Sequence, residues 1–194
     1  MWSGDLRAFG LGAIVVAAAL GQPPHGGVTN LDGEAVDVLR GAAGVRVTAL
    51  IFLRTDCPLA NQAAPEIERV RQQFDRRGVR VWLVYLDPAQ TADDIRRHQD
   101  EYQLRAPAIR DPDHHLVGLS QAQVTPSAAV FAHENGGRRL VYRGRLDDRV
   151  VALGKVRPRA TRFDLREAIE AVLAGHAVAL VSTPAIGCEI ADLR

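Results

Sequence analysis

The chain has 194 residues, enough for one domain with a substantial core, and 47% of them are hydrophobic and 24% charged, as in ordinary globular proteins. The formal net charge of +1 gives no electrostatic case for a nucleic-acid partner or an acidic lipid surface. Only two cysteines are present, Cys57 and Cys188, so an internal disulfide has to join these two.

The N-terminus has the layout of a secretory signal peptide. A short polar stretch containing Arg7 precedes the uncharged apolar run 8–20, and small residues follow. We therefore predict a signal peptide over 1–21, a linker over 22–27, and export to the periplasm or the extracellular space. The alternative is an uncleaved N-terminal membrane anchor, although the run is shorter than the ~20 residues that a spanning helix needs. After cleavage no membrane association is expected.

The first half of the predicted domain, which covers 28–175, alternates between strand and helix patterns. The sequence predicts a small hairpin over 28–39, a buried strand over 45–53 and a helix over 58–78. A second buried strand over 79–86 and a second helix over 91–102 follow. Thr91 and Asp94 form a capping-box pattern at the start of the second helix. This alternation is typical of a parallel α/β core.

The second half has shorter elements. The sequence predicts a short helix over 114–121, a strand over 127–132 and a hairpin turn over 135–137. A returning strand over 140–146 and a last helix over 161–175 follow. Thr161 to Asp164 is expected to cap the last helix, and Gly175 to close it. The polar segment 147–160 is expected to be a loop, and the tail 176–194 shows no clear element although it carries Cys188.

Cys57 is the best candidate nucleophile in the chain. It stands between an apolar strand pattern and a helix pattern, and Pro58 suits the first helical turn. Unpaired N–H groups and the positive end of the helix dipole favour a thiolate there. Arg54 would add to this effect and Asp56 would oppose it. The alternative is an inert cysteine buried under the helix.

Three motifs carry a resemblance to a known family. They are Thr55-Asp56-Cys57-Pro58, Val124-Thr125-Pro126, and Val141-Tyr142-Arg143-Gly144-Arg145-Leu146-Asp147. Together they resemble the thioredoxin-like redoxins of the alkyl hydroperoxide reductase/thiol-specific antioxidant (AhpC/TSA) family, in an exported bacterial type with a single active-site cysteine. The resemblance implies an α/β thioredoxin-like fold, with a central mixed β-sheet flanked by helices, over 28–175. The pair Gly187-Cys188 is similar to the tail of some exported bacterial redoxins.

The sequence departs from each well-known active site of these relatives. Ala60 stands where a thioredoxin has its second cysteine, and Asn61 stands where a copper chaperone has one. A peroxiredoxin places a threonine three residues before its cysteine, whereas Thr55 is two residues before Cys57. A second thiol therefore has to come from elsewhere.

The resemblance also implies a set of site residues. The catalytic candidates are Cys57, Cys188, Thr55, Pro126 and Arg145, and the substrate-binding candidates are Pro58, Thr125 and Arg143. Pro126 is expected to be a cis proline that faces the cysteine and exposes the backbone of Thr125 to a substrate strand. The alternative is a trans proline that opens an edge strand. Arg143 and Arg145 alternate along a strand, so only one of them can face the site.

Cys188 has three possible roles. It resolves an oxidised Cys57, or it forms a structural disulfide worth ~4–5 kcal/mol in the chain-entropy model, or it is a tail residue without a role. A disulfide requires Cα atoms within ~7 Å of each other. A separation of more than about twice that distance on an ordered tail would exclude the direct resolving role.

The sequence favours an exported thiol oxidoreductase that acts on disulfides or peroxides through Cys57, with Cys188 or a partner thiol resolving. Its expected partner is a protein thiol or disulfide that donates electrons, or a peroxide. The alternative is a non-enzymatic thioredoxin-like module that binds a partner or gives one thiolate to a metal. No cofactor is expected. No resident metal is expected either, since neighbouring helical residues such as His114 and His115 point about 100° apart and rarely bind one ion.

Overall fold

The computed structural model describes Met1 and residues 27–134 and 136–190. Apart from Met1, the predicted signal peptide lies outside the described residues, as does all of the predicted linker except Gly27. In the described part of the chain, no helix has both the length and the apolar character needed to cross a membrane.

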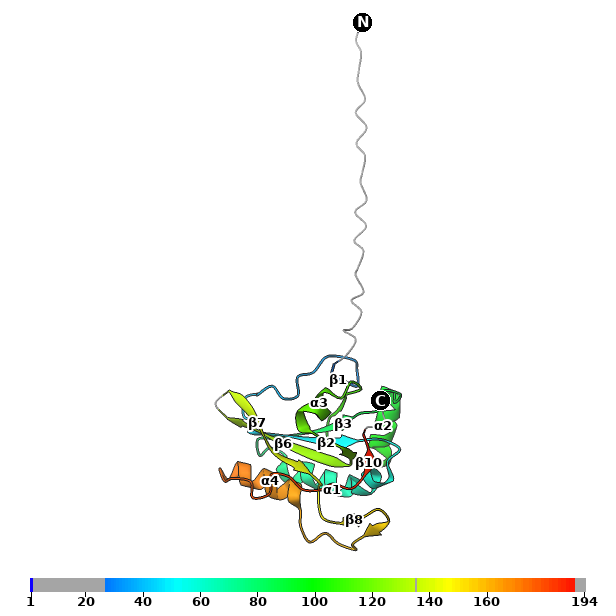
Figure 1. The fold of residues 1–194 in the computed structure, drawn as a ribbon. Coiled ribbons are helices and arrows are strands. Elements are labelled where there is room, and N and C mark those ends of the chain that lie inside the picture. Colours follow the sequence, from blue (N-terminus) through cyan, green and yellow to red (C-terminus); the bar gives the residue numbers. More distant parts are fainter. Residues whose placement is uncertain (2–26, 135, 191–194) are drawn as a thin grey trace.

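The centre of the molecule is a six-stranded mixed sheet with the strand order β1-β4-β3-β2-β6-β7 (Figure 1). Its strands are β1 (Thr29–Asn30), β2 (Val47–Leu53), β3 (Val79–Tyr85), β4 (Ala108–Arg110), β6 (Ser127–Glu134) and β7 (Gly137–Gly144). β2, β3 and β4 run parallel to one another, whereas β6 runs antiparallel to β2, and β7 to β6. This arrangement confirms the predicted α/β fold with a central mixed sheet.

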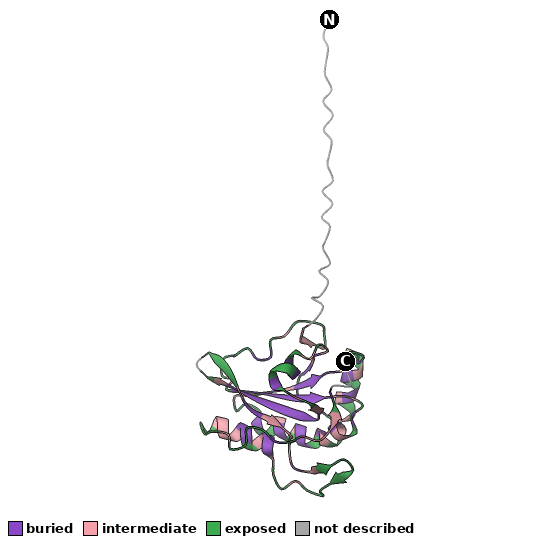
Figure 2. Ribbon diagram, in the orientation of Figure 1, coloured by how far each residue is buried: buried purple, intermediate pink, exposed green. Residues whose placement is uncertain are grey.

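β2 lies in the middle of this sheet, and all seven of its residues are buried. Because side chains alternate along a strand, Ala49 and Ile51 join the cluster that includes α1, while Leu50 and Phe52 join the cluster on the opposite face. Figure 2 shows the buried residues concentrated in the sheet and on the helix faces turned toward it. Burial on both faces explains the continuous apolar run of the sequence.

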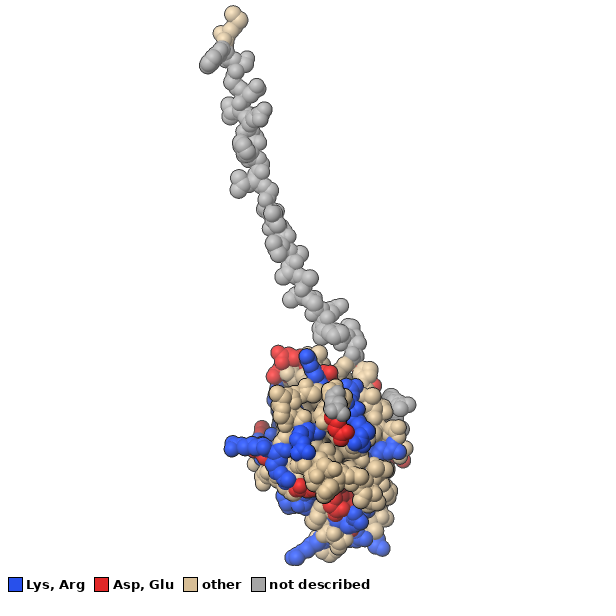
Figure 3. Space-filling view, turned by 90° about the vertical axis from the view of Figure 1, so that its left-hand side faces the viewer, with Lys and Arg blue, Asp and Glu red and all other residues tan. Residues whose placement is uncertain are grey.

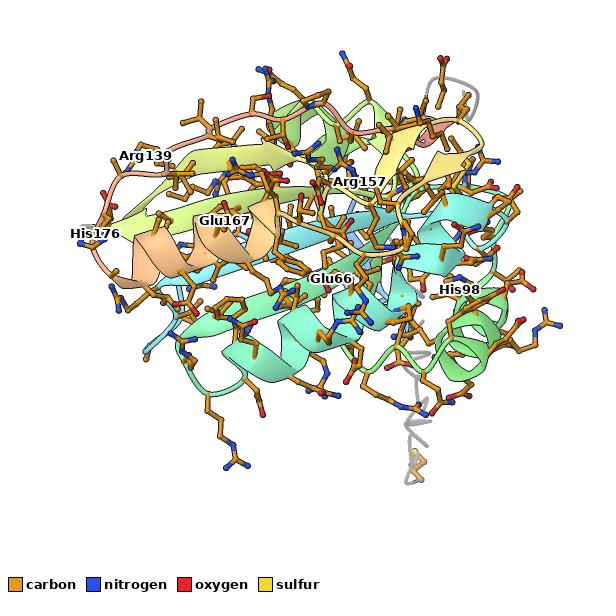
Figure 4. All side chains as sticks on the ribbon, turned by 90° about the horizontal axis from the view of Figure 1, so that it is seen from below. Glu66, His98, Arg139, Arg157, Glu167 and His176 are labelled. Carbon is orange, nitrogen blue, oxygen red and sulfur yellow. A yellow bond between two sulfur atoms is a disulfide. The ribbon has the colours of Figure 1, made fainter. Side chains whose placement is uncertain are left out.

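In the described part of the chain, four helices cover the sheet: α1 (Pro58–Phe74), α2 (Ala92–Glu101), α3 (His115–Ser120) and α4 (Asp164–Leu173). α1 and α4 lie on one face and α3 on the other (Figure 1). Figure 4 shows Glu66 of α1 turned toward α4, where its carboxylate lies 2.8 Å from the Arg166 guanidinium. The capping box of α2 is confirmed, because the side chains of Thr91 and Asp94 each bond the other residue's backbone N–H.

Two predicted helix ends need correction. α1 ends at Phe74 and not at Gly78. Gly78 instead has φ +75° and lies close to Gly44, because a Cβ added to Gly78 would be 2.8 Å from the Gly44 carbonyl oxygen. The predicted cap of α4 is also wrong. The N-cap is Phe163, without a side-chain hydrogen bond, and the Thr161 hydroxyl donates to Asp148 at 2.6 Å instead.

Two segments without predicted elements contain short strands. The expected loop 147–160 forms a small hairpin, β8 (Val150–Ala152) with β9 (Lys155–Val156). The tail, expected to have no element, forms β10 (Cys188–Glu189), which pairs with β5 (Val124–Thr125). Neither strand pair belongs to the main sheet. On the face shown in Figure 3, charges of both signs are interspersed, in agreement with the small net charge.

Candidate redox site

Cys57 is the N-cap residue of α1, directly after the loop that leaves β2. Pro58 is the first helical residue, as predicted, and it is exposed, whereas Cys57 is 1% exposed. The first turn of the 17-residue helix contains no acidic residue, so no side-chain charge there opposes the positive end of its dipole. The start of a helix favours a thiolate form of a cysteine, and the burial of Cys57 acts in the opposite direction.

The structure joins Cys57 to Cys188 in a disulfide, with a Cα–Cα distance of 6.2 Å and a sequence separation of 131. This distance is within the range that a disulfide requires, so the direct resolving role of Cys188 survives its geometric test. The expectation of a site with a single active-site cysteine is not confirmed, since the C-terminal tail brings a second sulfur to the helix start.

The loop before β6 faces the disulfide. The Thr125–Pro126 peptide bond is cis, as expected, and the Thr125 carbonyl oxygen lies 3.1 Å from the Cys57 sulfur. β10 pairs with β5 in antiparallel register, with Cys188 opposite Thr125. The backbone edge that was expected to receive a substrate strand is therefore occupied by the chain's own tail.

Two contacts anchor the tail on either side of Cys188. Upstream, the Thr183 hydroxyl lies 2.7 Å from the Tyr142 hydroxyl and accepts from the backbone N–H of Arg145 at 3.2 Å. Downstream, Ile190 is 3% exposed within the core cluster that includes α3, and its N–H donates to the carbonyl of Gln123 at 2.9 Å. The tail is thus held by packing and hydrogen bonds as well as by the disulfide.

Two glycines allow the tail to approach so closely. Gly144 has φ +141°, and a Cβ at this position would collide with Thr183. A Cβ at Gly187 would collide with the carbonyl group of Thr125. The Gly-Cys pair noticed in the sequence is explained by this contact, because only glycine lets the tail backbone lie against the cis-proline loop.

The arginines near the site are engaged by acidic residues or by the tail. The Arg145 guanidinium lies 2.7 Å from the buried carboxylate of Asp164, and this hydrogen bond raises the pKa of Arg145. Arg143 contributes its backbone, which bonds Val181 and Thr183 of the tail. Arg54 forms an ion pair with Asp56 at 2.9 Å, so its charge is partly neutralised.

Arg145 also lines a shallow and mainly apolar hollow next to the cis proline. Pro126, Leu59 and, from the tail, Ile186 form part of its wall. Val150 and Val156 bring the β8–β9 hairpin to the same hollow. Of the two alternating arginines, Arg145 is therefore the one beside the cis proline, while Arg143 borders a different hollow together with Ser182 and Thr183.

A buried polar network supports the loop that carries Cys57, and sequence reasoning missed it. The side-chain amide of Asn61 donates to the Thr55 carbonyl at 3.2 Å and to the Tyr102 hydroxyl at 3.1 Å. Its carbonyl oxygen lies 2.9 Å from His98 Nε2, and His98 Nδ1 lies 2.8 Å from the Tyr85 hydroxyl. Thr55 therefore takes part through its backbone, in a network that fixes the loop.

The network requires one tautomer of His98. The amide oxygen of Asn61 can only accept, so Nε2 carries the proton and Nδ1 accepts from the Tyr85 hydroxyl. Burial lowers the pKa of His98, although the charge of Glu101 acts in the opposite direction. Burial also raises the pKa of Tyr85. Both shifts favour the neutral forms that satisfy the network. The one signal in the sequence was Asn61 itself, a polar residue where relatives carry a thiol.

The described residues contain no group of three or more histidine, cysteine, aspartate or glutamate residues placed to hold a metal ion.

The fold and the site together define the class of protein. A mixed sheet, a cysteine at the start of the first long helix and a cis proline facing it are the features of a thioredoxin-like redox protein. The AhpC/TSA family model matches residues 22–139, and the chain belongs to this family. Comparison with curated proteins gives no match.

Solved structures with the same fold include proteins from several bacteria. A hypothetical protein of Sinorhizobium meliloti 1021 is 26% identical, with a TM-score of 0.65 over 76% of this chain and 80% of that chain. An uncharacterised conserved protein of Geobacillus kaustophilus is 25% identical, with a TM-score of 0.67 over 87% and 89%. DsbF of Mycobacterium tuberculosis, solved in mixed oxidised and reduced forms, is 16% identical, with a TM-score of 0.51 over 75% and 92%.

Proposed function

We propose that this chain is an exported thiol–disulfide oxidoreductase whose Cys57 and Cys188 alternate between a disulfide and a dithiol. One observation carries the proposal: the disulfide joins the cysteine at the start of α1 to a cysteine held against the cis-proline loop. A disulfide with a purely structural role does not need a helix start that favours its thiolate form, whereas an exchanging disulfide does.

The oxidative half of the cycle follows from the site. In the dithiol form, the Cys57 thiolate attacks one sulfur of a partner disulfide, and the other partner sulfur leaves as a thiolate. The Cys188 thiolate then attacks the Cys57 sulfur, so that the Cys57–Cys188 bond forms and the second partner sulfur leaves. Two electrons have passed to the partner. The anchors at Thr183 and Ile190 keep Cys188 within reach for the second step.

The surroundings of Cys57 favour a disulfide over a peroxide as the oxidant. A peroxide oxygen would have to be polarised by a cation, yet Arg54 and Arg145 each hold a carboxylate, that of Asp56 and that of Asp164. The same disulfide disfavours a thiolate–metal role, because both sulfurs are bonded to each other. Thr55, Pro58, Thr125 and Pro126 then shape the edge that a partner strand meets after the tail has opened.

The proposed location rests on the sequence and on redox chemistry. The N-terminal pattern over 1–21 predicts export, and disulfides persist in oxidising compartments such as the periplasm or the extracellular space. The expected partner is a thiol protein of the same compartment that restores the dithiol. N-terminal sequencing of the protein recovered outside the cytoplasm would identify the cleavage site near residue 21.

Turnover with a protein disulfide tests the function. Oxidised insulin is incubated with a low-molecular-weight thiol and the wild-type chain, Cys57→Ser or Cys188→Ser, and its reduction is followed. We expect each serine variant to lose at least about 100-fold of the catalysed rate, since the covalent step needs the nucleophile. Gly118→Ala is the matched control, because an added Cβ meets nothing within 4 Å at that position. Full activity in both serine variants would refute the proposal.

A further inference from the structure

The two cysteines of the disulfide differ in how far their residues are exposed to solvent. Cys57 is 1% exposed, because the start of α1, the cis-proline loop and the tail surround it. Cys188 is only half-buried, and its strand neighbour Glu189 is exposed. A thiol that approaches the oxidised protein from outside therefore meets Cys188 before Cys57.

The two sulfurs also differ as leaving groups. Thiol–disulfide exchange is faster when the leaving thiol has the lower pKa. Attack on Cys188 expels Cys57 at the start of α1, where the unpaired N–H groups of the first turn can stabilise a thiolate. Attack on Cys57 would expel Cys188 from a two-residue strand next to Glu189, where no helix end is available. Access and leaving-group stability thus select the same sulfur.

We infer that the reductive half of the cycle begins at Cys188, and this inference rests on the proposed function. A donor thiol loses its proton to solvent, and its thiolate attacks the Cys188 sulfur. A donor–Cys188 disulfide forms, the Cys57–Cys188 bond breaks, and its electron pair stays on Cys57 as a thiolate. A second donor thiolate then attacks the donor sulfur of the mixed disulfide, so that the donor leaves as a disulfide and Cys188 as a thiolate.

The anchors of the tail suit this order of events. Thr183 and Ile190 hold the segment on both sides of Cys188 through contacts that do not involve sulfur. The donor adduct is therefore carried on a tethered strand at the surface, while Cys57 stays covered. The donor class that fits is a dithiol protein, whose second thiol can complete the reduction before Cys57 attacks the adduct again.

Trapping the first adduct tests the inference. The oxidised full-length chain is mixed with excess glutathione, quenched with acid at early times and alkylated, and the modified peptides are mapped by mass spectrometry. The inference predicts that the adduct with glutathione on Cys188 and the alkyl group on Cys57 exceeds the opposite adduct at least about tenfold, when the amounts are extrapolated to zero time. This ratio corresponds to ~1.4 kcal/mol between the barriers for attack on the two sulfurs. Glutathionylated Cys57→Ser and Cys188→Ser proteins serve as standards for the two adducts.

The outcomes separate this inference from the function on which it rests. If glutathione appears first on Cys57 while Cys188 is alkylated, or on both to a similar extent, the protein still exchanges thiols but entry at Cys188 is refuted. If no concentration of glutathione or dithiothreitol opens the disulfide in the folded chain, the proposed oxidoreductase function fails, and the inference fails with it.

Discussion

The two ends of the disulfide are held by very different parts of the molecule. Cys57 follows a fully buried seven-residue strand and starts a 17-residue helix, so the core of the fold fixes its position. Cys188 belongs to a two-residue strand outside the main sheet, fixed by local contacts of Thr183 and Ile190. The difference teaches that the core of the fold supplies one sulfur of the pair, and that a tethered segment supplies the other.

Removing either sulfur gives the largest expected change in stability. Cys57→Ser and Cys188→Ser should each lower the free energy of unfolding of the oxidised protein by about 2–5 kcal/mol, since the disulfide spans a sequence separation of 131. Urea denaturation of both variants and of reduced wild type measures the loss. Cys57→Ser should be the less stable, because it also buries a hydroxyl in the core. Stabilities equal to that of oxidised wild type would show that the bond does not form.

Gly187→Val acts on the tail alone. Its side chain would collide with the Thr125 carbonyl, and such overpacking typically costs about 1–3 kcal/mol. In the reduced protein the tail between its anchors can move away from Thr125 and avoid the collision, so reduced Gly187→Val should unfold like reduced wild type. The equilibrium constant for forming the disulfide in glutathione buffers should therefore fall about tenfold or more. Gly118→Ala is the control and should leave the constant unchanged. An unaltered constant for Gly187→Val would mean that β10 is not paired with β5 in solution.

Thr183→Ala weakens the upstream anchor. It removes the contacts of the Thr183 hydroxyl with Tyr142 and with the backbone of Arg145, worth about 1–2 kcal/mol together. The potential of the disulfide should become less negative by roughly 20–40 mV, because 30 mV corresponds to about 1.4 kcal/mol. Ser182→Ala, at the exposed neighbouring position, is the matched control. A larger shift for Ser182→Ala than for Thr183→Ala would contradict the assignment of the anchor.

The smallest effect concerns pH and the Cys57 side of the comparison. Burial lowers the pKa of His98 in the folded protein. Below about pH 6.5 the unfolded chain therefore binds more protons than the folded chain. The free energy of unfolding falls as the pH falls, by at most about 1.4 kcal/mol per pH unit. Burial and Arg138 lower the pKa of His133 in the same sense. Stability measured between pH 7.5 and 5 in wild type and His133→Gln isolates the second contribution, and the same measurement in His98→Gln isolates the first. Parallel curves for wild type and His98→Gln would contradict it.

Local periodicity made the core predictable from the sequence. The apolar run of β2, the amphipathic face of α1 and the capping box of α2 each depend on residues close together in the chain, and each is confirmed. The cis state of Pro126 came from the family resemblance, since a Thr-Pro pair alone does not determine it.

The parts that were not predicted depend on distant contacts. β10 has two residues, too few for any periodic pattern, and it exists because Cys188, Thr125 and Gly187 meet across the fold. The hairpin β8–β9 is held by Asp148, which accepts hydrogen bonds from Thr161, a residue that looked like a helix cap. The network of Asn61 needed the position of α2, which no pattern around Asn61 reveals.

The reduction potential of the Cys57–Cys188 pair tests the central claim most directly. The oxidised and reduced forms are equilibrated in dithiothreitol and glutathione buffers, and free thiols are counted after an acid quench. A redox-active pair is predicted to have a potential between about −300 and −120 mV, the range of thiol–disulfide oxidoreductases. A potential below about −300 mV, where structural disulfides of secreted proteins lie, would contradict the proposed exchange and leave the disulfide as a structural bond between the core and its tail.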